Sequence, residues 1–226
     1  MRKTDVRKNN QLYHKSNRRK IESMSPLQSH DLIICCAKKT EPNYFAGCID
    51  FIYSKSNAVK FDIYSDGIDP KTIAIKLNNI VKNIQHQKDI KYHKIWVVFD
   101  KDNFKDNDFD KAISDINKKA NCTVLWSNVC FEVWLLLYFH YFENDIGAKD
   151  CVEKLSDSFK TKLNKDYDKT NTNVYQDIAN IGDLHSALDR ADRLLKKDVL
   201  PSKNTPATTV FEFFEHYTKY LNIDFI

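Results

Sequence analysis

Two aspartates follow one of the most apolar stretches of the chain. In the run Lys94-Ile-Trp-Val-Val-Phe-Asp-Lys-Asp102, Asp100 and Asp102 come directly after five apolar residues. A continuous hydrophobic run is typical of a buried parallel strand, and ligands of open α/β sheets bind beyond the carboxyl ends of such strands. Mg²⁺ binds through one or two carboxylates, water and substrate phosphate. The pattern therefore indicates phosphodiester chemistry. Its alternative is an ordinary turn in which Asp102 or Asn103 caps the next helix.

The segments around these aspartates alternate between strand-like and helix-like patterns. Strands are expected at 32–36, 59–64, 95–99 and 123–126, and helices at 42–53, 70–87, 109–120 and 131–142. This order predicts an α/β fold with a parallel sheet and helices on both faces. The helix at 131–142 is apolar on nearly every side, which predicts burial.

After Gly147 the pattern becomes purely helical. Helices are expected at about 148–163, 174–198 and 207–221, joined by polar stretches. We therefore divide the chain into a basic flexible arm at 1–28, an α/β core at 29–146 and a helical extension at 147–226 that packs on the core.

The composition is that of a globular chain with one basic end. Hydrophobic residues make up 42% of the 226 positions, which is enough for a sizeable core. The net charge is +4, yet residues 1–28 alone carry eight basic and two acidic side chains, so the remainder is slightly acidic. Such an arm favours phosphate-rich partners, unless it is a solvated terminus that only aids solubility.

Membrane and disulfide classes are not expected. The longest apolar stretch is well short of the roughly 20 residues that span a bilayer, and the polar, basic first residues do not resemble a signal peptide. We therefore expect a cytoplasmic protein with no membrane partner. The six cysteines form no C-x-x-C pair and show no Cys/His spacing typical of zinc, so they are expected to be reduced structural thiols.

Several segments resemble, in order, the motifs of the RloB/AbiLii family of restriction-linked and abortive-infection proteins. The matching segments are 32–45, the Gly67-Ile-Asp-Pro70 turn, 96–104, 126–137 and Asn204-Thr-Pro-Ala-Thr-Thr-Val210. The resemblance implies a Toprim-like (Rossmann-like) sheet flanked by helices, with a C-terminal helical extension. It also implies an endonuclease that uses Mg²⁺ (or Mn²⁺) in bacterial anti-phage defence. Its target would be DNA or RNA, with tRNA among the candidates, and an AAA/ABC-type ATPase is often encoded beside it.

The implied metal site joins a glutamate after the first strand to Asp100 and Asp102. Where the family pattern is Cys-Glu-Gly-x-Lys-Thr-Glu-Pro, this chain has Cys35-Cys-Ala-Lys-Lys-Thr-Glu-Pro42, so Cys36 stands at the expected glutamate. A thiol is a soft ligand that suits magnesium poorly. Either Glu41 takes over as the third metal-binding and catalytic carboxylate, or the chain has kept binding and lost cleavage, or position 36 was changed deliberately.

Other polar residues next to these motifs complete the expected site. Lys38 and Lys39 follow the first strand and are predicted to bind substrate phosphate, with Lys39 also stabilising the transition state; their alternative is a solvated loop. Asn128 matches the family's Ser-Asn-Pro element and is expected to position substrate, unless it caps a helix. Glu132 could reach the cleft or simply favour the start of its helix.

Two functions therefore remain open from sequence. The first is a metal-dependent endonuclease. The second is a catalytically degenerate Toprim-like subunit that binds within a defence complex with an ATPase. Topoisomerase chemistry is set aside, because it would need a nucleophilic tyrosine in a separate DNA-gate domain. Tyr167 and Lys169 lie in the polar stretch 164–173 and could contact a substrate, although nothing in their spacing requires it.

Overall fold

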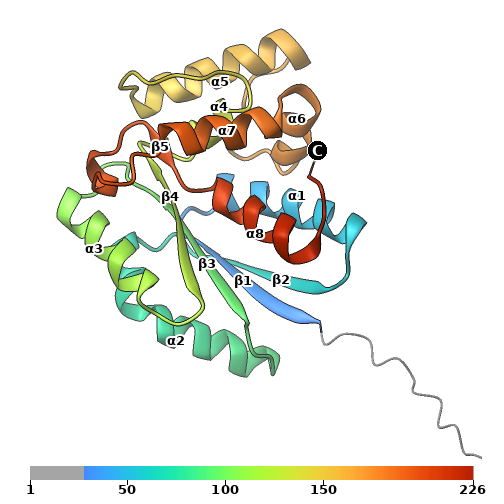
Figure 1. Ribbon diagram of the computed structural model, residues 1–226, viewed down its shortest axis with the longest axis vertical. Coiled ribbons are helices and arrows are strands. Elements are labelled where there is room, and N and C mark those ends of the chain that lie inside the picture. Colours follow the sequence, from blue (N-terminus) through green and yellow to red (C-terminus); the bar gives the residue numbers. More distant parts are fainter. Residues whose placement is uncertain (1–27, 226) are drawn as a thin grey trace, which may run out of the picture.

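A twisted sheet forms the centre of the protein. In the computed structural model, residues 28–225 are described, and they build a five-stranded sheet of order β2-β1-β3-β4-β5 (Figure 1). The parallel strands are β1 (Ser29–Cys35), β2 (Val59–Ser65), β3 (Lys94–Asp100) and β4 (Cys122–Asn128). The α/β class is thus confirmed, and the arrangement is compatible with a Rossmann-like or Toprim-like fold. The basic arm expected at 1–28 lies, but for Gln28, outside the described residues.

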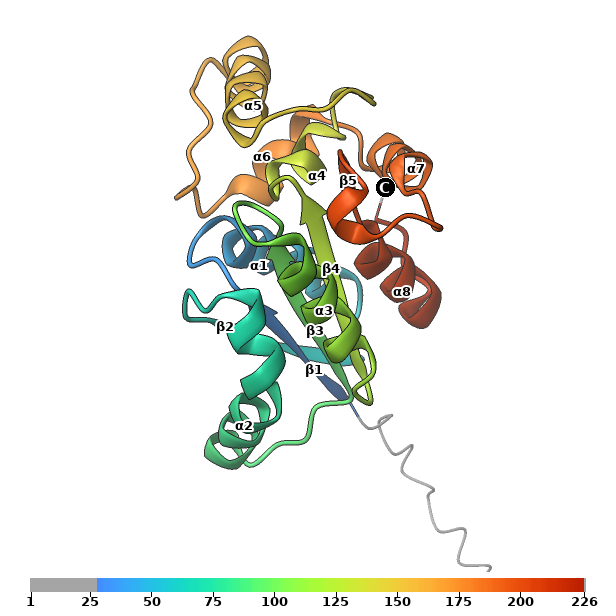
Figure 2. The same ribbon diagram turned by 90° about the vertical axis from the view of Figure 1, so that its left-hand side faces the viewer.

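Helices cover both faces of the sheet and its carboxyl end. One face carries α2 (Pro70–Lys88) and α3 (Asp106–Asn117), and the other carries α1 (Thr40–Lys55) and α8 (Phe211–Leu221). Above the carboxyl ends of the strands lie α4 (Glu132–Leu136), α5 (Ala148–Leu163), α6 (Val174–Ile181) and α7 (Leu184–Leu194) (Figure 2). None of the helices in residues 28–225 is long and apolar enough to cross a membrane.

The core is divided into two apolar clusters by the sheet. Side chains of a strand alternate between its faces, so Leu32 and Ile34 of β1 pack in the cluster under α2 and α3. Ile33 and Cys35 pack in the larger cluster under α1 and α8, which extends into α4 to α7. The near-continuous apolar runs of the central strands follow from this burial on both sides.

Three elements differ from the sequence expectation. The helix expected at 131–142 ends at Leu136, although residues 137 and 138 remain buried; burial on all sides, and not helical periodicity, accounts for this apolar run. The helix expected at 174–198 is broken into α6 and α7 at Gly182, where a Cβ would lie only 2.7 Å from the Tyr138 Cβ atom. The helix expected from 207 starts at Phe211.

Residues 207–208 form a short strand, β5 (Ala207–Thr208), which pairs antiparallel with β4. Thr208 Oγ1 and Ser127 Oγ share a hydrogen bond of 2.9 Å, and the backbone N–H of Trp126 donates to Thr209 Oγ1 at 2.9 Å. The Asn-Thr-Pro-Ala-Thr-Thr-Val element therefore closes the edge of the sheet beside β4. Purely helical structure after Gly147 was a wrong expectation, because these threonines find their partners on a strand.

The cysteines are distributed through this core. All six are free thiols in the described part of the chain, and Cys35, Cys48, Cys130 and Cys151 are buried. Burial raises the pKa of the Cys35 and Cys48 thiols well above the usual range. Protonated and surrounded by apolar side chains, they pack as small hydrophobic residues.

Candidate metal centre

The carboxyl ends of β1, β3 and β4 bring acidic side chains to one region of the molecule. Glu41 is the second residue of α1, soon after β1 ends, and Asp100 is the last residue of β3. Glu132 is the first residue of α4, shortly after β4. Because β1, β3 and β4 are adjacent and parallel, the turns that follow them meet at the carboxyl end of the sheet. We call Glu41, Asp100, Asp102 and Glu132 the carboxylate cluster.

Glu41 is as buried as Glu132, but one of its oxygens has no partner in the described residues. Glu41 is 2% exposed, and its Oε2 atom has no hydrogen-bond partner among the described residues. Burial raises its pKa well above the usual range, and the charges of Asp100 and Glu132 raise it further. Its own backbone N–H, at the start of α1, opposes this only in part. A buried carboxylate with repulsive neighbours and an unpaired oxygen is costly unless something compensates it.

Asp100 shares this environment. Desolvation raises its pKa to about 7, and the charges of Asp102 and Glu132 add to the rise, while the Phe131 backbone N–H opposes it. Asp102 itself is exposed and adopts a left-handed conformation (φ 36°) in the loop after β3. Its backbone N–H donates to the Val129 carbonyl at 2.8 Å, which links the loops after β3 and β4. The cluster is therefore buried at Glu41 and reaches solvent at Asp102.

Glu132 differs from the other acids because it is paired. Lys169 Nζ lies 2.9 Å from its Oε1 atom, and the Tyr167 hydroxyl donates to the same oxygen at 3.2 Å. Both partners come from the loop between α5 and α6. This loop is fastened to the start of α1, where Thr40 Oγ1 donates to the Lys169 carbonyl at 3.4 Å and Asn43 Nδ2 donates to the Thr170 carbonyl at 3.2 Å.

From sequence, Tyr167 and Lys169 were candidates for contact with a substrate, and their contacts with Glu132 were not predicted. Tyr167 and Lys169 lie more than thirty residues from Glu132 in the sequence, and no local sequence pattern predicts their contacts with it. The only sequence signal was their place in a polar stretch between helices. The helical extension thus supplies a cation to the edge of the α/β core.

Cys36 lies within reach of the same cluster. Burial raises the pKa of its thiol well above the usual range, and the charges of Glu41, Asp100 and Asp69 raise it further. Its backbone N–H donates to the Val98 carbonyl at 2.9 Å, so the residue continues the line of β1 beside β3. The position at which the family pattern has glutamate therefore faces the acids that would form the metal site.

The lysines after β1 are exposed. The Lys38 stem lies along Gly67, where a Cβ would be only 2.4 Å from the Lys38 Cε atom and where φ is +66°. Glycine is therefore favoured in the Gly67-Ile-Asp-Pro70 turn by its left-handed conformation, whereas the flexible Lys38 side chain could move away from a Cβ. Hydrogen bonds from Thr170 lower the pKa of Asp168, and the charge of Lys39 lowers it further, so Lys39 lies near the loop that carries Lys169.

Asn128 is buried and points its amide at the segment before β5. Its Nδ2 atom donates to the carbonyls of Pro201 at 3.0 Å and Ser202 at 3.2 Å, in the 3₁₀ turn at Pro201–Lys203. The residue is 4% exposed. Asn128 thus fastens the C-terminal segment to the end of β4, and its predicted contact with substrate remains a prediction.

The donor chemistry of the cluster suits a hard cation. Within residues 28–225, no group of three or more His, Cys, Asp or Glu side chains is arranged so that it could hold a metal ion by itself. Mg²⁺ does not require such a group, because it usually keeps several waters and takes only one or two protein carboxylates. The unpaired Oε2 of Glu41 and the repulsion between Glu41 and Asp100 are what a bound cation would relieve. The Cys36 thiol is the one poor donor beside them.

Comparison with known proteins identifies the family. No curated protein and no solved structure matches the chain. A family model described as RloB-like protein matches residues 32–216, a span that contains the whole carboxylate cluster, the loop with Tyr167 and Lys169, and β5. Since this match covers most of the chain, the protein belongs to the RloB-like family.

Proposed function

We propose that this protein is a nuclease that hydrolyses phosphodiester bonds with the help of Mg²⁺ or Mn²⁺. Membership of the RloB-like family associates it with bacterial defence against phage, and we place the activity there. One observation carries the proposal: Glu41 and Asp100 are held together and desolvated, and Glu41 has an oxygen without a partner in the described residues. Such an arrangement is unfavourable alone and favourable around a cation.

The proposed metal-binding residues are Asp100, Asp102 and Glu41. A bound divalent ion would neutralise charge on the substrate phosphate and so favour attack at phosphorus. Because the pKa of Asp100 is about 7 in the metal-free protein, a cation must compete with a proton for its carboxyl group below neutral pH. Asp102, on the exposed side of the cluster, is the acid most open to an entering phosphate.

The surrounding lysines supply the positive charge that phosphate needs. Lys38 and Lys39 are exposed in the loop after β1, at the same edge of the sheet, and are proposed to bind the nucleic-acid backbone. Lys39 is proposed to stabilise the developing charge of the transition state as well. Lys169 is held by Glu132, so its ammonium group is fixed in position before substrate arrives.

The first test is cleavage itself. Purified protein incubated with single-stranded and duplex DNA, RNA and tRNA is expected to cut at least one of them with Mg²⁺ or Mn²⁺, and none in EDTA. Asp100→Asn is expected to lower the rate by roughly a hundredfold or more, because the isosteric amide removes a charged ligand. Asp115→Asn is the matched control, since Asp115 lies on α3 with an ion pair to Lys111 (2.7 Å). Undiminished cleavage by Asp100→Asn would contradict the proposal.

A second candidate function is favoured by Cys36. Without a glutamate at this position, the protein could act as a catalytically degenerate subunit that binds nucleic acid beside an AAA/ABC-type ATPase. Calorimetric titration with Mg²⁺ separates the two functions, because the nuclease must bind the ion and the degenerate subunit need not. Absence of both metal binding and cleavage, also with the ATPase present, would favour the subunit.

Cys36→Glu sharpens this test. The new carboxylate would join Glu41 and Asp100, and affinity for a hard cation rises with the number of charged oxygen ligands. We expect Mg²⁺ to bind roughly tenfold more tightly or better. Cys36→Gln is the control, because it adds similar bulk without charge. Equal Mg²⁺ affinities for the two variants would show that position 36 does not face the ion.

A further inference from the structure

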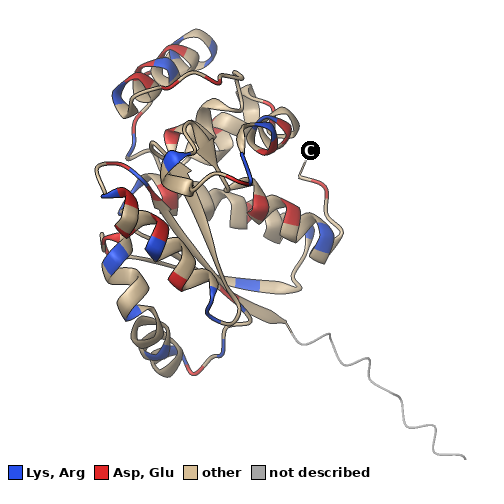
Figure 3. Ribbon diagram, turned by 60° about the vertical axis from the view of Figure 1, so that its left-hand side comes forward, with Lys and Arg blue, Asp and Glu red and all other residues tan. Residues whose placement is uncertain are grey.

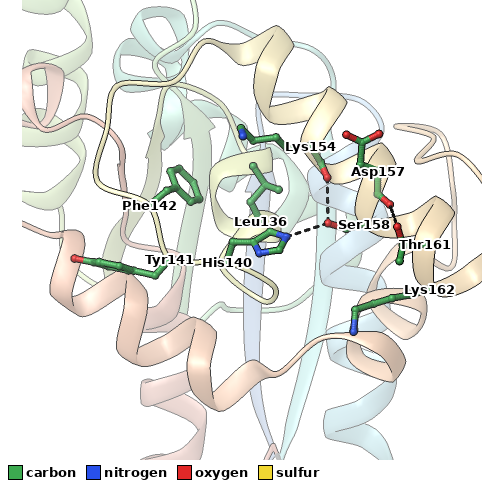
Figure 4. A pocket seen from close by; sticks show the side chains of 9 residues that line it. All are labelled: Leu136, His140, Tyr141, Phe142, Lys154, Asp157, Ser158, Thr161 and Lys162. Atoms are coloured by element: carbon green, nitrogen blue, oxygen red, sulfur yellow. Dashed lines mark hydrogen bonds between the residues drawn. The ribbon is translucent and has the colours of Figure 1, made fainter.

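A cavity lies away from the carboxylate cluster, between α5 and the segment that follows α4. Its volume is about 470 Å³ (Figure 4). One wall is apolar and is formed by Leu136, Tyr141 and Phe142, whereas α5 supplies a polar wall. Figure 4 shows Ser158 between Lys154 and Lys162, across from Tyr141 and Phe142. Pockets of about 300–1,000 Å³ typically hold small organic ligands.

The apolar wall includes an aromatic ring that is not stacked on another ring in the described residues. This ring belongs to Phe142, which is partly buried and packs against the main core cluster beside the cavity. Tyr141 is different, because the Arg193 guanidinium lies 4.3 Å from its ring centroid and covers one face. An unstacked ring on the wall of a cavity can accept a planar base, whichever base it is.

The polar wall is formed by side chains of α5, two of which are lysines. Lys154, Ser158 and Lys162 are spaced i, i+4, i+8 and so share one face of α5. Neither of these lysines has an ion-pair partner in the described part of the chain. By contrast, Lys149 and Lys160 on the same helix are paired with Glu153 at 3.6 Å and Asp166 at 2.8 Å. Two ammonium groups without ion-pair partners in the described residues suit a phosphate group, whereas the Ser158 hydroxyl already donates to the Lys154 carbonyl at 3.1 Å.

The neighbouring side chains agree with an anionic ligand. His140 lines the cavity with its Nε2 atom 3.4 Å from Ser158 Oγ. Burial lowers the pKa of His140, and the charges of Arg190, Lys154 and Lys162 lower it further, so the field at this ring is positive. Asp157 is the one carboxylate among the lining residues, and it can accept a hydrogen bond from a base amino group or a ribose hydroxyl.

We propose that this cavity binds a nucleoside phosphate, with the base stacked on Phe142 and the phosphate held by Lys154 and Lys162. The same chemistry is presented by a free mononucleotide and by one nucleotide of a bound strand. The site shares no residue with the carboxylate cluster, and the proposal does not depend on cleavage.

The test is calorimetric titration of the full chain in EDTA with AMP, CMP, GMP and UMP, with a single-stranded hexanucleotide, and with inorganic phosphate. We expect at least one nucleotide ligand to bind with 1:1 stoichiometry and more tightly than phosphate. The double variant Lys154→Gln/Lys162→Gln should weaken binding by about tenfold or more, since it removes two charge-assisted contacts. Lys149→Gln/Lys160→Gln, which changes two exposed lysines of the same helix outside the cavity, should leave the affinity unchanged.

Phe142→Leu tests the stacking contact, because leucine keeps apolar volume and removes the ring. It should weaken the nucleotide by several-fold or more and leave any affinity for inorganic phosphate as it was. Binding of the hexanucleotide alone, with the same sensitivity to the variants, would identify the occupant as a nucleotide of a strand. The proposal is overturned if no ligand binds, if phosphate binds as tightly as every nucleotide, or if the two double variants behave alike. A protein that binds nucleotides in EDTA and never cleaves would refute only the nuclease.

Discussion

Two buried acids near opposite ends of β1 have opposite surroundings. Asp31, near the start of the strand, is 2% exposed and accepts hydrogen bonds from the Tyr217 hydroxyl at 2.6 Å and the Lys94 backbone N–H at 3.1 Å. Trp96 Nε1 donates to the same hydroxyl at 2.9 Å, which completes a chain of bonds. Glu41, past the other end of the strand, is equally buried, but it faces Asp100 and Glu132 and keeps an oxygen unpaired in the described residues.

The difference separates an acid whose hydrogen bonds compensate its burial from one whose neighbours oppose it. Burial raises the pKa of both, yet at Asp31 the hydrogen bonds oppose the rise, whereas at Glu41 neighbouring carboxylates reinforce it. Away from their ends, the central strands carry no charged residue (Figure 3). In β1 and β3 the charged residues thus lie near the strand ends, whereas β2 carries Asp62 at its middle. Asp31 near the amino end is hydrogen-bonded, but Glu41 beyond the carboxyl end, where ligands of such sheets bind, keeps an oxygen without a partner in the described residues.

The largest expected effect is a loss of stability of the metal-free protein as pH rises, caused by the acids at the carboxyl end of the sheet. The pKa of Asp100 is about 7 in the folded protein and near 4 when unfolded, so the folded state binds more protons between these values. The free energy of unfolding should therefore fall between pH 5 and 8, by about 2 to 3 kcal/mol from Asp100 alone. Around Asp100, the acids Glu41, Asp102 and Glu132 favour the protonated form and Lys169 opposes it.

Urea denaturation in EDTA at a series of pH values measures this loss. Glu41 and Asp31 also have raised pKa values and change stability in the same direction, so the informative quantity is the difference between the parent protein and Asp100→Asn. The variant should show a flatter profile. Parallel profiles would mean that Asp100 titrates normally and that the cluster is well hydrated.

A second, somewhat smaller effect is expected at the amino end. Tyr217→Phe deletes one hydroxyl and leaves Asp31 Oδ2 and Trp96 Nε1 without that partner in a dry core. The cost of such unpaired groups predicts a loss of about 2 kcal/mol in the free energy of unfolding, at any concentration of Mg²⁺. Tyr220→Phe, on the same helix and 57% exposed, should change it by less than about 0.5 kcal/mol. A small loss for Tyr217→Phe would remove the contrast between the two ends.

The sequence was sufficient for the features that depend on local pattern. Buried parallel strands produce apolar runs that can be recognised in the sequence. Polar residues directly after such a run lie at the carboxyl end of the strand, so the positions of Asp100 and Asp102 could be predicted. The turn at Gly67 could likewise be predicted, because glycine there meets a backbone requirement. The catalytic roles of these residues remain predictions.

Features that depend on distant partners were not predictable in the same way. β5 exists because Thr208 and Thr209 find Ser127 and Trp126 some eighty residues earlier. The loop with Lys169 reaches Glu132 only because α5 and α6 fold over the carboxyl ends of the strands. The early end of α4 has the same origin, since an apolar run buried on all sides gives no periodicity to separate helix from irregular chain.

The smallest expected effect is the change in the free energy of unfolding caused by Glu41→Gln, and its sign tests the contrast most directly. Glu41→Gln keeps the shape of the side chain and removes a charge that faces Asp100 and Glu132, so the metal-free protein at pH 8 should become more stable by about 1 kcal/mol. Glu132→Gln is the counterpart and should lower the free energy of unfolding by about 1 kcal/mol, because it breaks the pair with Lys169 (2.9 Å).

Addition of Mg²⁺ at ten times its dissociation constant should stabilise the parent protein by about 1.4 kcal/mol. The same addition should stabilise Glu41→Gln much less. If Glu41→Gln instead lowers stability as Glu132→Gln does, Glu41 is a satisfied structural acid like Asp31, and the carboxyl end of the sheet holds no site for a cation.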